Sequence, residues 1–262
     1  MLLANKVVMI SGLGPGLGIK LALAAASEGA AAVVLGARNI DNLDAAARRI
    51  AALGSTCQVL TMPTDIHEAG QCRALAAETL ARFGRIDALI NNAFVYGGYL
   101  PVETAEPEQW TSVIDTNLYG SVRMTQAVLP AMKAQGGGAI LNINSQSSVR
   151  SNPGEAAYAA SKAALSAVTR HFARELGRYN IRVNTARMGH LGGVPQQRAL
   201  AEYAAANNAT PEQILDSMRQ SVALDRICSD DECALAALLL ISDYALPISG
   251  ATLDINGGDF MP

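Results

Sequence analysis

The chain has 262 residues, of which half are apolar and few are aromatic, and a formal net charge of −3. This length can bury a substantial core, as one large domain or two small ones. The scattered basic residues exclude the electrostatic footprint of a nucleic-acid-binding protein, and no apolar run reaches the roughly 18 residues that a membrane span needs.

Short apolar runs that predict strands alternate with longer helical patterns along the chain. The predicted strands cover residues 6–11, 32–36, 58–62, 86–91, 138–144, 181–186 and 252–255. The predicted helices cover residues 16–28, 41–53, 68–83, 106–134, 155–178 and 232–241. This alternation is typical of parallel strands joined by helical crossovers. We therefore expect an α/β fold with a doubly wound, mostly parallel sheet, in a single domain over residues 1–262.

Residues 189–223 depart from this alternation. They contain a Gly-Gly pair, two prolines and two short helical patches, near residues 196–206 and 211–222. Insertions of this kind in compact domains are often lids or substrate-binding segments, although an ordinary helical excursion has the same pattern. We expect a substrate-binding segment here.

The cysteines and histidines do not have the spacing of a metal site or of a disulfide framework. The cysteines are Cys57, Cys72, Cys228 and Cys233, none of them in a CxxC pair, and the three histidines lie far apart. The stretch before the first strand is too short for a signal peptide. We therefore expect free thiols, a cytoplasmic protein and no metal site.

Glycines follow the first strand immediately and open the first helix. Glycine permits a tight turn with positive φ and lets the backbone approach a phosphate closely. The following helix presents free N–H groups and the positive end of its dipole to a pyrophosphate. The spacing differs from GxGxxG, but the strand before it and the helix after it favour a dinucleotide site. The residues of this predicted site are Ser11, Gly12, Gly16, Leu17 and Gly18.

The end of the second strand bears on the choice of cofactor. An acidic residue there would bind the hydroxyls of the adenosine ribose, but the sequence has Arg38 and no acid. A guanidinium can hold a 2′-phosphate through charge-assisted hydrogen bonds. We therefore expect NADP(H) to be favoured, with NAD(H) as the alternative if Arg38 is merely solvated.

A set of three residues in the second half of the chain is suited to moving a proton on and off an alcohol oxygen. Tyr158 and Lys162 are four residues apart, so they lie on one face of the predicted helix. The pKa of an isolated tyrosine is about 10, and a nearby cation lowers a tyrosine pKa by favouring the phenolate. Ser145 follows the fifth strand, where ligands bind in parallel sheets, and can hydrogen-bond a substrate oxygen.

These residues together resemble the short-chain dehydrogenase/reductase family over essentially the whole chain. The glycine turn is similar to TGxxxGxG, with Ser11 in place of threonine, and residues 91–93 are similar to NNAG, with Phe94 in place of its glycine. Residues 182–184 match an RVN strand. The resemblance implies a seven-stranded parallel Rossmann-type sheet flanked by helices and assembly as a homotetramer or dimer.

The resemblance also implies roles for individual residues. Asn117, Ser145, Tyr158 and Lys162 match the catalytic tetrad, in which the asparagine supports the lysine through water and the lysine also binds the nicotinamide ribose. Asp65 matches the acid at the adenine ring, and Asn91 is expected near the adenosine ribose. The further cofactor contacts implied are Ile66, Asn92, Ala93, Met188 and Gly189.

The sequence departs from the family pattern after the sixth strand. A Pro-Gly motif reads Met188-Gly189, and the threonine that contacts the nicotinamide carboxamide has no counterpart in residues 190–193. The expected substrate contacts, besides Ser145 and Tyr158, are Phe94, Gln146, His190 and Leu191. Phe94 could instead belong to the core, and His190 could be a surface residue or a second acid/base.

The function that this pattern predicts is hydride transfer between NADP(H) and a secondary alcohol/ketone with an apolar body. One alternative is an NAD-dependent catabolic dehydrogenase of the same fold. Another is a non-catalytic cofactor-binding regulator or scaffold, which would not need the tetrad. The expected partner is a small-molecule substrate.

Overall fold

A seven-stranded sheet forms the centre of the computed structural model, which describes residues 1–194, 197, 200–201, 204 and 209–261. The strand order is β3-β2-β1-β4-β5-β6-β7, and each neighbouring pair is parallel. The strands are β1 (Val7–Ser11), β2 (Ala32–Ala37), β3 (Gln58–Pro63), β4 (Ala88–Asn91), β5 (Gly138–Ser145), β6 (Ile181–Met188) and β7 (Thr252–Ile255). The predicted fold class is confirmed.

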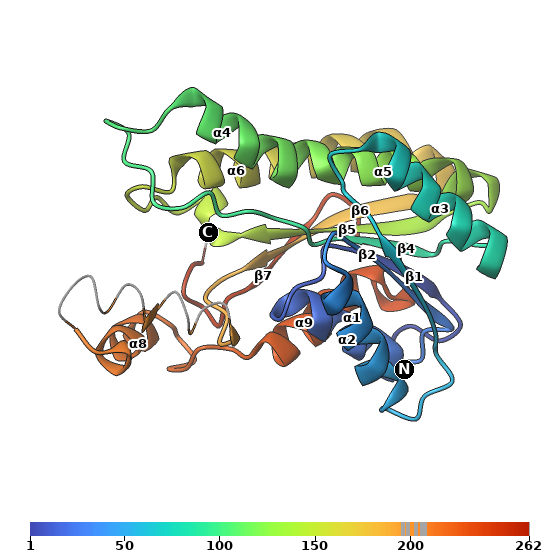
Figure 1. The fold of residues 1–262 in the computed structure, drawn as a ribbon, viewed down its shortest axis with the longest axis horizontal. Helices are drawn as coiled ribbons and strands as arrows, with labels where there is room; N and C mark the ends of the chain where they lie inside the picture. Colours follow the sequence, from blue (N-terminus) through green and yellow to red (C-terminus); the bar gives the residue numbers. More distant parts are fainter. Residues whose placement is uncertain (195–196, 198–199, 202–203, 205–208, 262) are drawn as a thin grey trace.

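Helices cover both faces of this sheet, as Figure 1 shows. On one side lie α1 (Leu17–Ser27), α2 (Ile40–Ala51) and α9 (Asp230–Leu238). On the other lie α3 (Ala69–Phe83), α4 (Pro107–Ile114), α5 (Gly120–Ala134) and α6 (Ala156–Leu176). Because neither face of the central strands meets water, β1, β2 and β4 are buried at every residue and their sequences are continuous apolar runs rather than alternating ones.

The helical stretch predicted over residues 106–134 is present, but it is not uniformly α-helical. The chain forms α4, then a π-helical turn at Asp115–Tyr119, and then α5. A π turn inserts one residue into the helical repeat and is frequent at functional sites. Here it contains Asn117, which is fully buried.

Helix α8 (Pro211–Gln220) extends beside the layered body and belongs to the segment predicted to bind substrate (Figure 1). Thr210 caps it, since its hydroxyl accepts from the backbone N–H of Gln213 while the Gln213 side chain bonds back to the N–H of Thr210. The other predicted helical patch, near residues 196–206, lies largely outside the described residues.

The strand order changes direction at β1, whose neighbours are β2 and β4. Its last residue, Ser11, pairs with Gly36 of β2 and Asn91 of β4. At the same edge of the sheet, Ser145 at the end of β5 pairs with Met188 at the end of β6. Parallel sheets bind ligands outside the carboxyl ends of their strands near such a reversal. The register therefore brings the predicted cofactor and catalytic residues to one edge.

The core consists of two apolar clusters, one on each face of the sheet. The first joins β1 to α1, α2 and α9, and the second joins it to α3, α5 and the end of α6. Within the described residues, no helix combines the length and the apolar character needed to cross a membrane.

Candidate active site

Tyr158 and Lys162 lie one turn apart on α6, beside the carboxyl end of β5. The Lys162 side chain is buried, with the whole residue 3 % exposed, and its ammonium donates to the backbone carbonyl of Ile143 at 3.0 Å. Burial disfavours the charged form and lowers the pKa of Lys162 to about 8. The Lys162 Nζ atom lies 5.8 Å from the centre of the Tyr158 ring.

Ser145 occupies the last position of β5, and its hydroxyl lies close enough to the Tyr158 side chain to influence the pKa of that phenol. The backbone N–H of Ser145 donates to the side chain of Asn144, and Ser147 N–H donates back to the Ser145 hydroxyl at 3.2 Å. These bonds fix the serine at the strand end. The arrangement places two hydroxyl groups together, as a site that polarises and protonates a carbonyl oxygen requires.

The pKa of Tyr158 differs from the sequence-based expectation. Burial raises it to about 12, the neighbouring Ser145 hydroxyl opposes this rise, and the negative charge of Glu155 adds to it. We expected Lys162 to lower it. In this structure desolvation outweighs the favourable groups, so the site holds Tyr158 as a neutral phenol at neutral pH.

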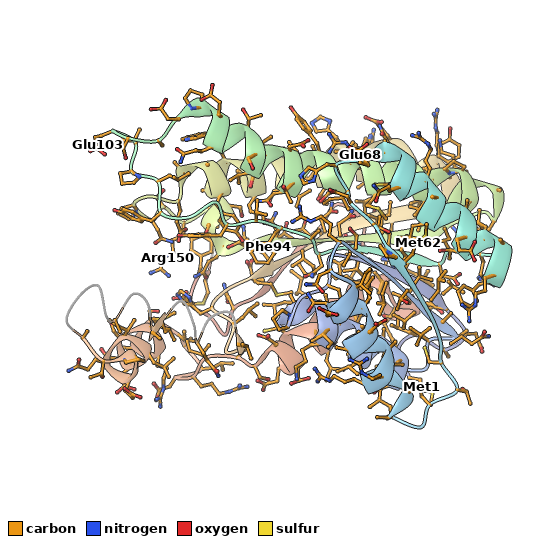
Figure 2. All side chains as sticks on the ribbon, viewed as in Figure 1. Met1, Met62, Glu68, Phe94, Glu103 and Arg150 are labelled. Atoms are coloured by element: carbon orange, nitrogen blue, oxygen red, sulfur yellow. The ribbon has the colours of Figure 1, made fainter. Side chains whose placement is uncertain are left out.

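Aromatic rings line the approach to Tyr158. The Phe94 and Tyr96 rings lie 6.3 and 5.4 Å from the Tyr158 ring, centre to centre, and both are tilted against it. Lys162 Nζ lies 5.7 Å from the Phe94 ring centre. Phe94 is 54 % exposed, so it lies at the surface beside the tyrosine rather than in the core (Figure 2).

Asn117 binds the backbone of the segment that carries these rings. Its side-chain carbonyl accepts from the N–H of Val95 at 2.8 Å, and its amide donates to the Val95 carbonyl at 2.9 Å. The same amide donates to the Ser161 hydroxyl on α6 at 3.0 Å. Asn117 therefore joins the π turn, the segment after β4 and the catalytic helix.

The glycine turn has the space and the free N–H groups that a dinucleotide requires. Gly12 has a φ of +91°, and a Cβ there would overlap the backbone of Ala93. A Cβ on Gly18 would lie 2.7 Å from the Gly12 carbonyl oxygen. Helix α1 starts after Gly16 with no side-chain cap, which leaves its first N–H groups open toward this turn. These residues fit the pyrophosphate of a dinucleotide.

Asn91 and Asn92 have different roles. The Asn92 amide donates to the Gly12 carbonyl at 2.7 Å and so supports the glycine turn. The Asn91 amide instead donates to Thr125 on α5 at 3.3 Å and to Asn142 on β5 at 2.9 Å. The Asn91 side chain therefore belongs to a buried polar network, and a position of Asn91 near the adenosine ribose stays a prediction.

Arg38 and Asp65 lie close together near the ends of β2 and β3. Arg38 is exposed. Burial alone would raise the pKa of Asp65, but hydrogen bonds from His67 and the charges of His67 and Arg38 outweigh it and lower that pKa. His67 Nδ1 lies 2.7 Å from the Asp65 carboxylate and holds it in place. Ile66 is buried, and a Cβ on Gly120 would overlap its side chain, so Ile66 packs against the start of α5.

The residues after β6 meet the C-terminal end of the chain. Gly189 lies so close to Asn256 that a Cβ would approach the Asn256 Cβ at 2.5 Å. His190 Nε2 lies 3.6 Å from the Asp259 carboxylate, and burial lowers the pKa of His190. The Gln146 amide also donates to Asp259, at 2.7 Å. Leu191 instead bridges to Cys228.

Asp259 was not found from the sequence. Its side chain is fully buried and accepts from Arg150 at 2.9 Å and from Ser221, just after α8, at 2.6 Å. It therefore ties α8 to the segment after β5, on the side of the molecule where Figure 2 labels Arg150. No local motif marks such a residue, because its partners lie far away in the sequence.

Glu155 was also missed, although it is three residues before Tyr158. Its carboxylate accepts from the Tyr96 hydroxyl at 3.1 Å, from the Ser147 hydroxyl at 2.9 Å and from Asn152 at 3.0 Å. The signal available was its position, since a residue one turn before a catalytic group on the same helix lies on the same face.

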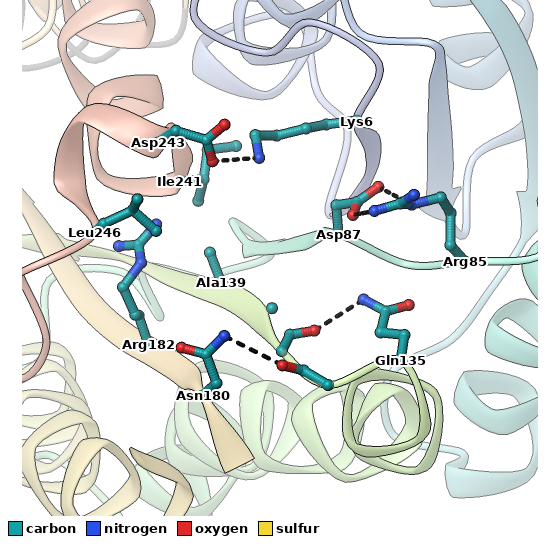
Figure 3. Close-up of a pocket in the computed structure, with 13 residues that line it drawn as sticks. Lys6, Arg85, Asp87, Gln135, Ala139, Asn180, Arg182, Ile241, Asp243 and Leu246 are labelled. Atoms are coloured by element: carbon teal, nitrogen blue, oxygen red, sulfur yellow. Dashed lines mark hydrogen bonds and ion pairs between the residues drawn. The ribbon is translucent and has the colours of Figure 1, made fainter. Parts of the chain in front are cut away.

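A polar hollow of about 210 Å³ lies at the opposite edge of the sheet (Figure 3). It is lined by residues that precede strands, among them Lys6, Asp87 and Asn180. Lys6 pairs with Asp243, and Arg85 with Asp87, as the dashed lines in Figure 3 mark. The hollow is therefore separate from the catalytic residues, which follow strand ends.

Comparisons with known proteins agree with this geometry. A family model described as short chain dehydrogenase matches residues 6–203. The chain is 32% identical to the 3-oxoacyl-[acyl-carrier-protein] reductase of Staphylococcus epidermidis over 257 residues, which cover 98% of this chain and 100% of the relative.

Two solved structures extend the comparison to the whole fold. L-sorbose reductase from Gluconobacter frateurii, complexed with NADPH and L-sorbose, superposes with a TM-score of 0.92 at 29% identity, covering 99% of this chain and 98% of that one. A 7α-hydroxysteroid dehydrogenase complexed with NADH and 7-oxoglycochenodeoxycholic acid superposes with a TM-score of 0.86 at 32% identity, covering 98% and 94%. The glycine turn, the strand order and the Ser145, Tyr158 and Lys162 arrangement thus have one explanation: the chain belongs to the short-chain dehydrogenase family of oxidoreductases.

Proposed function

We propose that the protein transfers a hydride between NADP(H) and a secondary alcohol/ketone pair whose body is apolar. One observation carries this proposal. The Tyr158 side chain lies beside Ser145 at a strand end, and Lys162 is buried on the same helix face as Tyr158. A non-catalytic scaffold would have no use for a buried lysine, which costs stability at this position.

The residues of the chain divide the chemistry of ketone reduction among them. A bound reduced nicotinamide supplies the hydride. Ser145 holds the substrate oxygen, and Tyr158, a neutral phenol, gives its proton to that oxygen as the alcohol forms. Lys162 places a positive charge near the phenolate that results, which limits the cost of that anion. In the oxidation direction Tyr158 takes the proton back.

The preference for NADP(H) rests on Arg38. Its exposed guanidinium lies at the end of β2, close enough to Asp65 for its charge to act on that carboxyl. A 2′-phosphate beside the ribose would meet this guanidinium, whereas an acid in its place would favour NAD(H). Structural relatives include a complex with NADPH and a complex with NADH, so either cofactor is compatible with the fold.

The residues proposed to hold the dinucleotide and the substrate are those expected from the sequence. The turn from Ser11 to Gly18 would bind the pyrophosphate, Asp65 and Ile66 the adenine end, and Met188 and Gly189 the carboxamide through their backbone. The substrate would lie against Phe94 and Tyr158, with residues 189–223 as the segment that covers it. The exposed rings and aliphatic side chains here, Phe94, Val149 and Val194 among them, support a substrate with an apolar body.

We also propose that the whole chain works as one catalytic unit and assembles in the cytoplasm as a homo-oligomer, a tetramer or a dimer. Exposed apolar side chains on and after α9 support this assembly, because they would be covered by a second copy. These side chains are Leu235, Leu239, Tyr244 and Leu246. Light scattering on the purified protein would measure the oligomeric state.

The first experiment titrates the protein with NADPH and NADH in parallel, following the fluorescence of the reduced nicotinamide. Arg38→Asp should weaken NADPH binding by about tenfold or more and spare NADH, since one charge-assisted contact is lost. Equal effects on both cofactors would refute the role of Arg38 and favour the NAD-dependent dehydrogenase.

Turnover is then measured with a panel of ketones. The panel contains cyclohexanone, acetophenone, an acetoacetyl thioester, L-sorbose and a 7-oxo bile acid. Tyr158→Phe should lower kcat at least a hundredfold while NADPH still binds. Substantial activity of this variant would refute the mechanism.

A further inference from the structure

His67 lies between the loop that follows β3 and the π-helical turn, and both of its ring nitrogens have partners. Nδ1 lies 2.7 Å from Asp65 Oδ1, and Nε2 lies 2.9 Å from the Thr116 hydroxyl. A carboxylate can only accept a hydrogen bond, so the proton of the first contact belongs to Nδ1. Hydrogen bonds at both ends fix the plane of the ring, and His67 is therefore a rigid support for the Asp65 side chain.

The two oxygens of the Asp65 carboxylate have different surroundings. Oδ1 accepts from the backbone N–H of His67 at 3.0 Å and also from the His67 ring. Oδ2 has no hydrogen-bond partner among the described residues, and 32 % of the Asp65 side chain is exposed. His67 thus occupies one oxygen twice and leaves the other free to accept from a ligand.

This carboxylate lies at the edge of the sheet where the dinucleotide is proposed to bind. Asp65 follows β3, whose last residue, Pro63, pairs with Ala37 at the end of β2. Arg38, the proposed reader of the 2′-phosphate, comes directly after Ala37, and its charge helps to lower the pKa of Asp65. The ribose that carries a 2′-phosphate also carries the adenine, so we expect the group that reads the base to lie beside Arg38.

Other contacts hold the loop around Asp65 independently of the His67 ring. The Ile66 carbonyl accepts from Arg123 on α5 at 3.4 Å, and the Ile66 side chain is buried. The backbone N–H of Asp65 donates to the Gln71 side chain at 2.8 Å. Replacing the His67 ring should therefore free the carboxylate and leave the backbone of the loop in place.

We propose that His67 is a positioning residue that makes the cofactor site selective for adenine. By holding Oδ1 of Asp65, it presents Oδ2 to the exocyclic amine of the base, which is a hydrogen-bond donor. Hypoxanthine has an oxygen in place of this amine, and two acceptors that face each other form no hydrogen bond. The proposal rests on the proposed function, because it requires Asp65 to lie at the adenine end of a bound dinucleotide.

Two substitutions separate the roles of the two ring nitrogens. An asparagine amide can place a donor near the position of Nδ1, whereas the longer glutamine side chain carries its amide to the position of Nε2. His67→Asn therefore keeps a donor for Asp65 and lacks the bond to Thr116, and His67→Gln does the reverse. If the ring only braced the loop against the π turn, the bond to Thr116 would be the one that matters.

The test compares the Kd of each protein for two reduced dinucleotides, followed by nicotinamide fluorescence. They are NADPH and its analogue with hypoxanthine in place of adenine, or the corresponding NADH pair if NADH binds more tightly. The wild type should bind the adenine form about tenfold more tightly or better, because hypoxanthine loses one hydrogen bond to a charged group. His67→Gln should reduce this preference to less than about threefold, and His67→Asn should retain it.

Two further variants serve as controls. An asparagine at position 65 has one acceptor oxygen, which His67 would occupy, and a donor in place of Oδ2. Asp65→Asn should therefore lose the preference for adenine. His171→Gln removes an exposed imidazole on α6 and should bind both dinucleotides as the wild type does.

Two outcomes would overturn the proposal. An undiminished preference in His67→Gln, even with weaker binding of both dinucleotides, shows that the ring only braces the loop. A loss in His67→Asn as complete as in His67→Gln shows that Nδ1 is not the group that positions Asp65.

The wild type and Asp65→Asn show whether the proposed function fails as well. Either outcome above leaves the proposed role of Asp65 intact if Asp65→Asn has lost the preference. A wild type that binds both dinucleotides equally removes the role of Asp65 and that of His67 together. A wild type that binds neither dinucleotide refutes the proposed function itself.

Discussion

Replacing Lys162 by methionine should change how the stability of the protein depends on pH. Lys162 is buried, and its ammonium has a backbone carbonyl, that of Ile143, as its hydrogen-bond partner. Burial lowers its pKa from 10.5 to about 8. At about 1.4 kcal/mol for each pH unit, this difference corresponds to about 3 kcal/mol of unfolding free energy.

Whether stability rises or falls with pH depends on how many protons the folded and unfolded states bind. Below pH 8 the lysine is charged in both the folded and the unfolded protein, and the folded state bears the cost of burying the charge. Between pH 8 and 10.5 the unfolded state binds more protons, so the stability of the wild type rises with pH through this window. Lys162→Met lacks this rise.

Urea unfolding followed by circular dichroism would measure the unfolding free energy of both proteins from pH 7 to pH 10. All samples need the same protomer concentration, because the stability of an oligomer depends on concentration. The free energy of the wild type minus that of the variant should rise over this range and approach about 3 kcal/mol at its upper end. Lys133→Met, which removes an exposed ammonium, controls for the loss of a positive charge. A difference that stays flat with pH would refute the buried-charge argument.

Two further changes test the supports of the site. Gly12→Ala should weaken NADPH binding at least tenfold in the fluorescence titration. A Cβ costs about 1–2 kcal/mol at positive φ, and here it would also overlap Ala93. Unchanged affinity would show that the turn relaxes to accept the Cβ. Asp259→Asn should lower the unfolding free energy by about 2 kcal/mol, since a buried carboxylate loses its charge opposite Arg150. This loss of stability should shrink as the pH falls through the lowered pKa of Asp259, because the wild-type carboxyl is then neutral too. Thermal unfolding at two pH values measures this effect, and a loss that does not vary with pH would contradict it.

The parts of the fold that repeat a local pattern could be predicted from the sequence. The last strand, Thr252–Ile255, has the predicted bounds, and the other strands differ only at their ends. Buried strands and crossover helices have distinct lengths and periods, so their order indicates a parallel sheet. Tyr158 and Lys162 could be found because helix geometry places residues four apart on one face.

The features of the fold and the site that depend on contacts between distant segments could not be predicted in the same way. The π turn at Asp115–Tyr119 has no sequence period of its own, so it could not be distinguished within the helical stretch predicted over residues 106–134. Asn91 and Asn92 are adjacent, yet one enters the core and the other supports the glycine turn, because successive residues at a strand end face opposite sides. The partners of Asp259 come from segments more than thirty residues away and only the folded chain brings them together.

The pKa values of the site also depend on the folded environment, and they bear on the direction of catalysis. From the sequence, we expected the cation of Lys162 to favour the phenolate form of Tyr158. In the structure desolvation and the negative charge of Glu155 raise the pKa of Tyr158, so Tyr158 retains its proton, while burial lowers the pKa of Lys162 to about 8. A protonated tyrosine is the form that ketone reduction consumes, and a phenolate is the form that alcohol oxidation needs. If the proposed function holds, the rate of ketone reduction should therefore fall relative to the rate of alcohol oxidation as the pH rises.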